Sequence, residues 1–422
     1  MSKKNGNIVA IITMIFLFGM ISFVTNLAAP IGNIWKMQPG IDGSNTLGMM
    51  GNMMNFLAYA IMGIPAGRML TKFGYKKTAL IAIAVGFIGV FVQFLSGVSV
   101  SFVVYLLGAF ICGFSVCMLN TVVNPMLKIL GGKKSNQYIQ IGGTFNSLMG
   151  TVTPMLVGVL IGQLTKSSVI SDVNPVLFIA MGVFAAAFVI LNFIDIQDPE
   201  GVKSDGKAES PWKFKHFIYG IIAIFIYVGV EVGIPGTLNF FLSDPDPEKG
   251  AGLDPSTAVK VAGFVAGTYW FMMLIGRFVS SFISGKVSAR TQLTTVSVVA
   301  IVLCLAAMFI PATSTTSMPV FTGSGFESAI VPVSALLLVL CGLCTSVMWG
   351  TIFDLAVEGL GTATNQASGI FMAMVVGGGI LPLLQNFIAD KAGYMPSYWV
   401  IVAGLAFILF FAVVGSRIVK KA

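Results

Sequence analysis

Charged residues are scarce in this sequence of 422 residues, where only 9% are Asp, Glu, Lys or Arg. A soluble domain carries about 25%, so the composition excludes a soluble enzyme, and the 56% hydrophobic content excludes disorder. Histidine occurs once, as His216, which argues against His-based catalysis and a His-built metal site. The five cysteines lie in apolar stretches without metal-like spacing. We therefore expect no catalytic residue, no resident metal and no cofactor.

Apolar runs long enough to cross a bilayer recur along the whole chain. A membrane helix needs roughly 20 such residues. The expected helices span about residues 8–34, 46–70, 78–96, 101–128, 138–163, 174–194, 217–242, 257–283, 292–310, 330–357, 365–388 and 395–416. A polar, charged segment at 195–215 follows the sixth helix. The sequence thus predicts an all-α integral membrane protein with twelve transmembrane helices in two pseudo-symmetric six-helix bundles, 1–194 and 216–422, joined by a cytoplasmic linker.

The net charge of +8 comes from lysines and arginines gathered in particular loops. If the N-terminus is cytoplasmic, eighteen of them fall on the cytoplasmic side and five, Lys36, Lys166, Lys249, Lys260 and Lys391, on the other. Cytoplasmic loops of membrane proteins are enriched in Lys and Arg. The pattern predicts a multi-pass protein of the cytoplasmic (inner) membrane with both termini inside. The positive charge thus reports topology in a lipid bilayer, and we expect no nucleic acid partner.

Weak internal similarity links the two halves. Cys112-Gly113 in the fourth helix has a counterpart in Cys341-Gly342 of the tenth, and Ala66-Gly67-Arg68 resembles Ile275-Gly276-Arg277 in the eighth. Such repeats at equivalent places of two six-helix halves favour a duplicated transporter over a receptor or a channel.

The loop after the second helix reads GRMLTKFGYKK, Gly67 to Lys77. Its two glycines and basic run resemble the signature between helices 2 and 3 of the major facilitator superfamily. Two positions depart from it, because Thr71 stands where an acid is usual and Tyr75 replaces a basic residue. The resemblance implies the fold of that superfamily, in which helices 1, 4, 7 and 10 line a central cavity.

Within that superfamily, stretches spread over nearly the whole chain resemble the fucose permease-like sugar symporters. They are NFLAYAIMGIPAGRMLTKFGYKK, NTVVNPMLKILG, TFNSLMGTVTP, YVGVEVGIPGTLNFFL, TYWFMMLIGRF, WGTIFDLAVEGLG and GGGILPLLQNFIAD. This resemblance implies a sugar as the cargo.

Three positions depart from the proton-coupled members of that family. The acids that they carry in helix 1 and helix 4 correspond to Asn26 and Asn120 here, and a helix 5 glutamine corresponds to Gly143. An asparagine cannot bind or release a proton, but it offers an uncharged donor and acceptor for sugar hydroxyls. The coupling of transport to an ion is therefore open: none, Na⁺ or H⁺.

Glu231 lies in the middle of the seventh expected helix, between apolar neighbours. A carboxylate at membrane depth is costly and is a functional candidate for that reason. It can accept a bond from a sugar hydroxyl, carry a proton for coupling or bind Na⁺. The alternative is an internal tie to a neighbouring backbone or to Tyr227.

Three further charges are predicted near the cytoplasmic face. Asp354 and Glu358 end the tenth helix and Arg277 lies at similar depth in the eighth. We expect them to pair as a structural or gating cluster, because a buried charge without a partner is strongly destabilising.

A sugar site combines an aromatic platform with polar partners for the hydroxyl rim. The platform candidates are Trp270 and Trp349. The rim candidates are Asn26, Asn120, Asn124, Asn146, Glu231, Asn239 and Gln385, with Asn386, Asn52 and Asn55 as further choices. Each can instead serve helix packing, but hydrocarbon penalises so many amides unless they meet partners or water.

These observations predict a monomeric secondary transporter that moves a small neutral sugar, a hexose by resemblance, through alternating access. Two alternatives belong to other classes: an exporter of drug-like or other metabolites, and a sugar sensor that no longer transports. The amide-rich helices argue against an exporter, and the few residues after the last helix argue against a sensor.

Overall fold

The computed structural model describes residues 3–131, 135–161, 168–194, 210–244, 246, 248–283, 287–311, 313–322, 325–360 and 364–418. Most of the segment 195–215, expected as a linker, lies outside these ranges.

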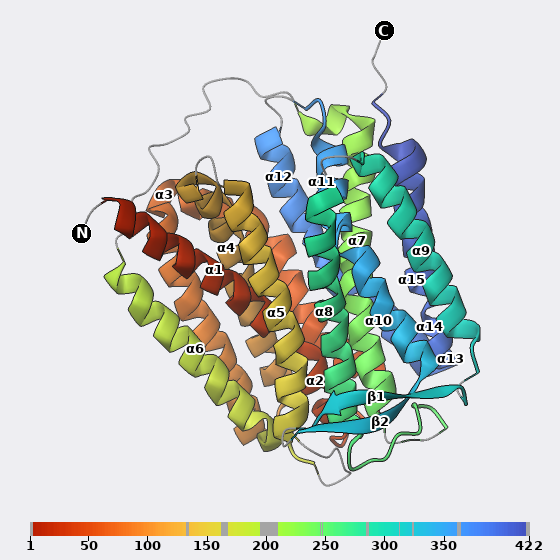
Figure 1. Ribbon diagram of the computed structural model, residues 1–422. Coiled ribbons are helices and arrows are strands. Elements are labelled where there is room, and N and C mark those ends of the chain that lie inside the picture. Colours follow the sequence, from red (N-terminus) through yellow and green to blue (C-terminus); the bar gives the residue numbers. More distant parts are fainter. Residues whose placement is uncertain are drawn as a thin grey trace.

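Helices make up nearly all of the described chain (Figure 1). The part before the linker contains α1 (Lys3–Thr25), α2 (Ala28–Lys36), α3 (Asn45–Ser99), α4 (Phe102–Gly131), α5 (Ser135–Ile161) and α6 (Asn174–Phe193). The part after it contains α7 (Lys215–Ser243), α8 (Ala258–Ile283), α9 (Ala289–Phe309), α10 (Val333–Thr345), α11 (Met348–Val357), α12 (Thr364–Ala373), α13 (Gly377–Ala392), α14 (Tyr394–Ser397) and α15 (Trp399–Phe410). We refer to α1–α6 as the N-terminal half and to α7–α15 as the C-terminal half.

The prediction of twelve membrane-crossing segments is confirmed, since 12 helical spans in the described residues are long and apolar enough to cross a bilayer. Several of them are interrupted. The first breaks between Thr25 and Ala28, and α3 holds two spans that meet near Gly74, whose φ of +80° allows the chain to reverse. Ser44 begins α3 by accepting a hydrogen bond from the amide of Leu47.

A β-hairpin was not foreseen. Strands β1 (Thr315–Phe321) and β2 (Phe326–Pro332) pair antiparallel, and α10 begins directly after them at Val333, close to the start expected at about 330. Val320 and Val331 are fully buried on one face of the hairpin, while Phe326 reaches the ring of Phe264 in α8. Each strand is only seven residues long, so a search for apolar runs of membrane-spanning length does not detect it.

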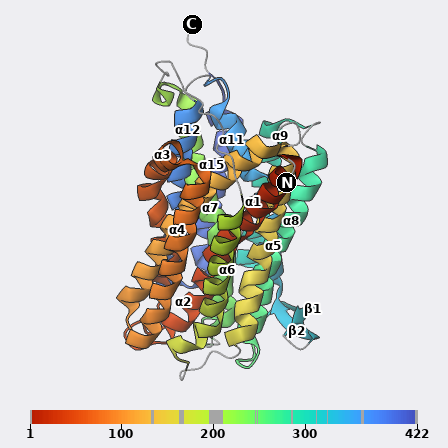
Figure 2. The same ribbon diagram turned by 90° about the vertical axis from the view of Figure 1, so that its left-hand side faces the viewer.

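The helices run roughly along one axis, with both chain termini toward one end and the hairpin at the other (Figures 1 and 2). We call these the terminus end and the hairpin end. Large apolar side chains such as Val103 and Phe193 are exposed on the outer surface, as expected of helices that face lipid.

The two halves meet most tightly through helices that carry glycine. A Cβ atom on Gly263 of α8 would lie 2.3 Å from the carbonyl oxygen of Pro154 in α5, and one on Gly267 would lie 2.5 Å from that of Thr151. A Cβ atom on Gly379 of α13 would lie 3.0 Å from the backbone of Met53 in α3. Small residues allow such backbone contact between membrane helices.

Candidate functional site

A cavity of about 750 Å³ lies between the two halves. It begins near mid-depth at Trp270 and Val232 and extends toward the terminus end, where Gln292 and the exposed Asp354 line it. Its volume falls within the range of roughly 300–1,000 Å³ that small-molecule sites occupy. The lining residues are Phe18, Ile21, Ser22, Thr25, Asn26, Phe56, Tyr59, Asn120, Gly143, Asn146, Tyr227, Val228, Glu231, Val232, Trp270, Arg277, Ser280, Ala289, Gln292, Ser346, Val347, Trp349, Gly350, Thr351, Asp354, Met372 and Val375.

Amides line the wall that the N-terminal half contributes. The Nδ2 group of Asn26 donates to the carbonyl oxygen of Ser22 at 2.9 Å, and that of Asn146 donates to the carbonyl oxygen of Phe18 at 2.8 Å. The Nδ2 group of Asn120 donates to the hydroxyl of Tyr59 at 2.7 Å. These bonds fix the orientation of each amide side chain at the cavity surface, and selective hydrogen bonding to a ligand requires such fixed groups.

Glu231 lines the same cavity from α7. The hydroxyl of Tyr227, one helical turn away, donates to its Oε1 at 2.8 Å, so the expected tie to Tyr227 exists together with access to the cavity. The Nη2 atom of Arg277 lies 3.9 Å from the same oxygen. The carboxylate thus has two partners and still borders open space, which suits a group that exchanges a ligand.

Arg277 does not belong to the charge cluster expected near the membrane surface. Its Nη1 atom donates to the carbonyl oxygen of Gly143 at 3.0 Å and to the hydroxyl of Ser147 at 2.9 Å, both in α5 of the other half. Asp354 lines the cavity mouth, and Glu358 is exposed, with its carbonyl oxygen 2.9 Å from His216 Nε2. Among described residues, no ion pair joins Arg277 to either acid. Arg277 instead lies beside Glu231 of α7, and its guanidinium packs against the backbone of α5 at Gly143.

Both candidate tryptophans lie at the cavity. Trp270 packs edge-on against Tyr269, with ring centroids 5.6 Å apart, and Trp349 packs against Tyr227 and Phe371 at 6.2 and 5.9 Å. Such neighbours hold each indole in place, as a platform for an apolar sugar face requires.

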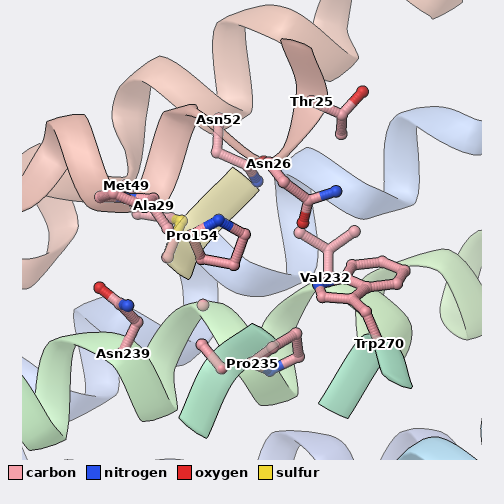
Figure 3. A pocket seen from close by; sticks show the side chains of 13 residues that line it. Thr25, Asn26, Ala29, Met49, Asn52, Pro154, Val232, Pro235, Asn239 and Trp270 are labelled. Atoms are coloured by element: carbon pink, nitrogen blue, oxygen red, sulfur yellow. The ribbon is translucent and has the colours of Figure 1, made fainter. Parts of the chain in front are cut away.

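A second, much smaller pocket of about 30 Å³ adjoins the cavity, and Figure 3 shows the side chains that line it. It shares Thr25, Asn26, Val232 and Trp270 with the cavity. Its other lining residues are Ala29, Pro30, Met49, Asn52, Pro154, Pro235, Gly236, Asn239 and Ala266. It holds about one water molecule, so the passage is nearly closed at this depth.

Several candidate residues lie elsewhere. Asn239 lines only the small pocket and accepts a hydrogen bond from Asn33. Gln385 is fully buried away from both pockets, where its Oε1 would lie 2.6 Å from a Cβ on Gly233 of α7. Its assignment to the cavity is therefore wrong: the glycine on α7 opens a niche that turns the side chain into the C-terminal half. The side chain of Asn124, on α4, lies outside the described part of the structure.

Sequence reasoning missed several polar lining residues, among them Tyr59, Ser22, Gln292 and Thr351. Tyr227 was foreseen, because it stands four residues before Glu231 on one helix face. The others resemble ordinary helix residues in sequence, and only the packing of both halves brings them together.

The described residues contain no group of three or more His, Cys, Asp or Glu able to hold a metal ion. The geometry instead provides fixed amides, two aromatic rings, an arginine and a carboxylate around a space for a small molecule. This arrangement can bind a hydroxyl-rich ligand between an apolar platform and a polar rim.

Comparisons with known proteins identify the family of this chain. Residues 9–382 match the family model of the Major Facilitator Superfamily. The chain is 30% identical over 428 residues to the glucose/galactose transporter of Brucella abortus (strain 2308), covering 99% of this chain and 96% of that protein. It is 22% identical over 371 residues to the L-fucose-proton symporter of Escherichia coli (strain K12), covering 81% of this chain and 78% of that protein.

Two solved structures share the fold. The superfamily transporter FucP in the outward conformation superposes with a TM-score of 0.66 at 19% identity, covering 98% of this chain and 100% of that chain. A bacterial homologue of the human lysosomal transporter Spinster, inward-facing and unoccupied, gives 0.65 at 15% identity, covering 99% and 98%. The expected fold is therefore confirmed.

Proposed function

Since this chain belongs to the Major Facilitator Superfamily, we propose that it is a secondary transporter that moves a small neutral sugar, a hexose, across the cytoplasmic membrane by alternating access. Two bundles, 1–194 and 216–422, rock about the central cavity, and the segment 195–215 joins them in the cytoplasm. The protein works as a monomer with both termini in the cytoplasm, in accordance with the excess of Lys and Arg in the loops of that side.

The observation that carries this proposal is the composition of the cavity wall. Asn26, Asn120 and Asn146 line a space of about 750 Å³ together with Trp270 and Trp349. Amides exchange hydrogen bonds with hydroxyls without bringing charge, and indole rings cover the apolar face of a pyranose. The names of the relatives, glucose/galactose transporter and L-fucose-proton symporter, support the same class of cargo.

Glu231 is the proposed coupling residue. It is the carboxylate at the centre of the cavity, and its partner Arg277 is 3.9 Å away rather than in close contact. A cation, whether Na⁺ or a proton, can therefore compete for the carboxylate while a sugar binds beside it. A transporter without ion coupling would use the same carboxylate only to accept a bond from a sugar hydroxyl.

Counterflow in proteoliposomes tests the proposal. Vesicles loaded with unlabelled glucose, galactose or fucose should take up the labelled sugar transiently, whereas vesicles loaded with a sugar acid or a hydrophobic drug should not. Counterflow needs no ion gradient, so it tests cargo independently of coupling. The same vesicles with an imposed Na⁺ or pH gradient then show whether uptake becomes concentrative and which ion drives it.

A matched variant makes the experiment specific to the cavity. Trp349→Leu removes a lining indole, and Trp399→Leu removes one that is 52% exposed on α15. We expect the first to lose counterflow and the second to keep it. Absence of counterflow with every neutral hexose in the unmodified protein would contradict the proposed cargo.

A further inference from the structure

The two halves are joined at the hairpin end by polar contacts that the cavity does not use. Below the small pocket, the Nδ2 group of Asn33 in α2 donates to Oδ1 of Asn239 in α7 at 2.6 Å, and both side chains are buried. Beyond this bond, toward the hairpin end, charged groups from both halves come together. They lie where an opening toward that end would have to form.

One contact is made by Asp390, near the end of α13. Its carboxylate accepts hydrogen bonds from the amides of Asn45 and Thr46 at 2.7 and 2.9 Å, and from the hydroxyls of Ser44 and Thr46 at 2.9 and 2.6 Å. All of these donors belong to the first turn of α3 in the other half. The carboxylate thus satisfies backbone N–H groups that the helix start leaves without partners, and it meets the positive end of the helix dipole.

The second contact is made by Lys36, at the end of α2. Its side chain is only 2% exposed, which is rare for lysine. The Nζ atom donates to Oδ1 of Asn45 at 2.5 Å and to the hydroxyl of Tyr394 at 3.1 Å, and it lies 4.5 Å from the ring centroid of Phe240. Tyr394 and Phe240 both come from the C-terminal half.

Tyr394 links this ammonium to an acid. Its hydroxyl lies 2.6 Å from Oδ2 of Asp244, at the end of α7, and 2.8 Å from Oδ1 of Asn45, and it donates its one proton to the nearer, charged oxygen of Asp244. The phenol therefore accepts from a cation of one half and donates to an anion of its own half. A hydroxyl has one proton and two acceptor sites, so Tyr394 fits this position and phenylalanine would not.

The contact of Lys36 with the C-terminal half has a small net free energy, so it can form and break reversibly. Closing the halves removes the Lys36 ammonium from water, and this desolvation offsets much of the attraction. The contact is favourable only while its acceptors are present, because a buried ammonium without them costs more than an exposed one. When the halves separate, water replaces the acceptors.

We propose that Lys36, Tyr394, Asp244 and Asp390 form an electrostatic latch that holds the hairpin end closed while the cavity is open at the terminus end. The proposal rests on the alternating-access function proposed above and adds the group that sets the equilibrium between its two states. The latch senses closure through Lys36, whose ammonium keeps Asn45 of its own half as an acceptor but has the hydroxyl of Tyr394 only when both halves meet.

Spin-label distances in the sugar-free protein test the latch. The five native cysteines are buried, so labels can be directed to Ser171→Cys and Glu248→Cys, both at exposed positions of the hairpin end, one in each half. A second pair, Lys77→Cys and Arg417→Cys, reports the terminus end. Tyr394→Phe should raise the ratio of hairpin-open to hairpin-closed protein about tenfold, and Asp390→Asn about threefold because this carboxylate is more exposed.

Two controls decide the outcome. Tyr398→Phe removes a buried hydroxyl that bonds Ile234 within one half, and it should leave both distances unchanged. In a Lys36→Met background, Tyr394→Phe should lose its effect, since no ammonium is left that needs the hydroxyl as its second acceptor. The latch is overturned if Tyr394→Phe and Asp390→Asn both match the unmodified protein, or if Tyr394→Phe acts equally with and without Lys36. The readout needs no sugar, so failed counterflow with shifted distances would reject the cargo and keep the latch.

Discussion

The two walls of the cavity differ in chemistry although they come from halves with weak internal similarity. Among the described lining residues, the N-terminal half contributes amides, hydroxyls and apolar groups without a charge. The C-terminal half contributes Glu231, Arg277 and Asp354 together with both tryptophans. The two halves thus contribute different chemistry to one cavity. We interpret the N-terminal wall as the part that recognises hydroxyls and the C-terminal wall as the part that carries charge.

The largest effect is expected from the carboxylate of the charged wall. Glu231→Gln keeps the size of the side chain and an oxygen that can accept from Tyr227, but it cannot release or neutralise a charge. We expect concentrative uptake under an ion gradient to be abolished while counterflow persists. Parallel gradient-driven and counterflow assays in proteoliposomes measure both. Unchanged concentrative uptake would discard the coupling role of Glu231.

The next effect is expected at the arginine that bridges the walls. Arg277→Met leaves Glu231 without its cation and removes the bonds to Gly143 and Ser147. We expect the counterflow rate to fall by about tenfold to a hundredfold, since a charged hydrogen-bonding group is worth roughly 1.5–3 kcal/mol. Arg277→Lys should restore little, because an ammonium lacks the planar fork that reaches several acceptors. The exposed Arg417→Met is the control, and an equal loss there would reject the assignment.

A smaller effect is expected from the aromatic platform of the same wall. Trp270→Leu should weaken sugar binding about tenfold without changing which ion drives uptake, because the indole contributes contact area and no titratable group. Equilibrium binding of labelled sugar to the purified protein measures this. A change in ion dependence with unaltered affinity would mean that the two walls do not divide their tasks as we infer.

The smallest effects are expected from single amides of the uncharged wall. Asn26→Ala and Asn146→Ala should each weaken sugar binding by about twofold to tenfold, because one neutral hydrogen bond contributes about 0.5–1.5 kcal/mol. Gln385→Met is the matched control outside the cavity. It should leave affinity unchanged, and it should not lower the melting temperature, since neither amide atom of Gln385 has a hydrogen-bond partner in the structure. Loss of affinity in Gln385→Met alone would place the site elsewhere.

A position at the cavity was predicted correctly for several polar residues that stand alone in an apolar helix. Asn26, Asn120, Asn146 and Glu231 all line the cavity, because each has few other places that hydrocarbon would tolerate. Gln385 met the same criterion and lies outside, since a glycine on the facing helix provides a buried niche that no pattern within α13 reveals.

The partner of a charged side chain was harder to predict than its position at the cavity. Arg277 was expected to pair with Asp354 and Glu358 by depth along the sequence, yet it contacts Glu231 and α5. The choice depends on the rotation of α8 about its axis and on its packing against α5 at Gly143. The hairpin at 315–332 was missed for a related reason. A short strand is stabilised by pairing with another strand, and this pairing cannot be read from the strand's own sequence.

Composition and hydrophobic length alone determined that this chain spans a membrane with twelve helices, because hydrocarbon accepts few structures other than helices that satisfy their own backbone. The tertiary structure decided which polar groups share the cavity. It also decided which other polar groups, among them Lys36, Tyr394 and Asp390, join the halves at the hairpin end. These contacts connect segments hundreds of residues apart. Their geometry depends on how two bundles pack, and no local pattern in a helix encodes the position of the other half.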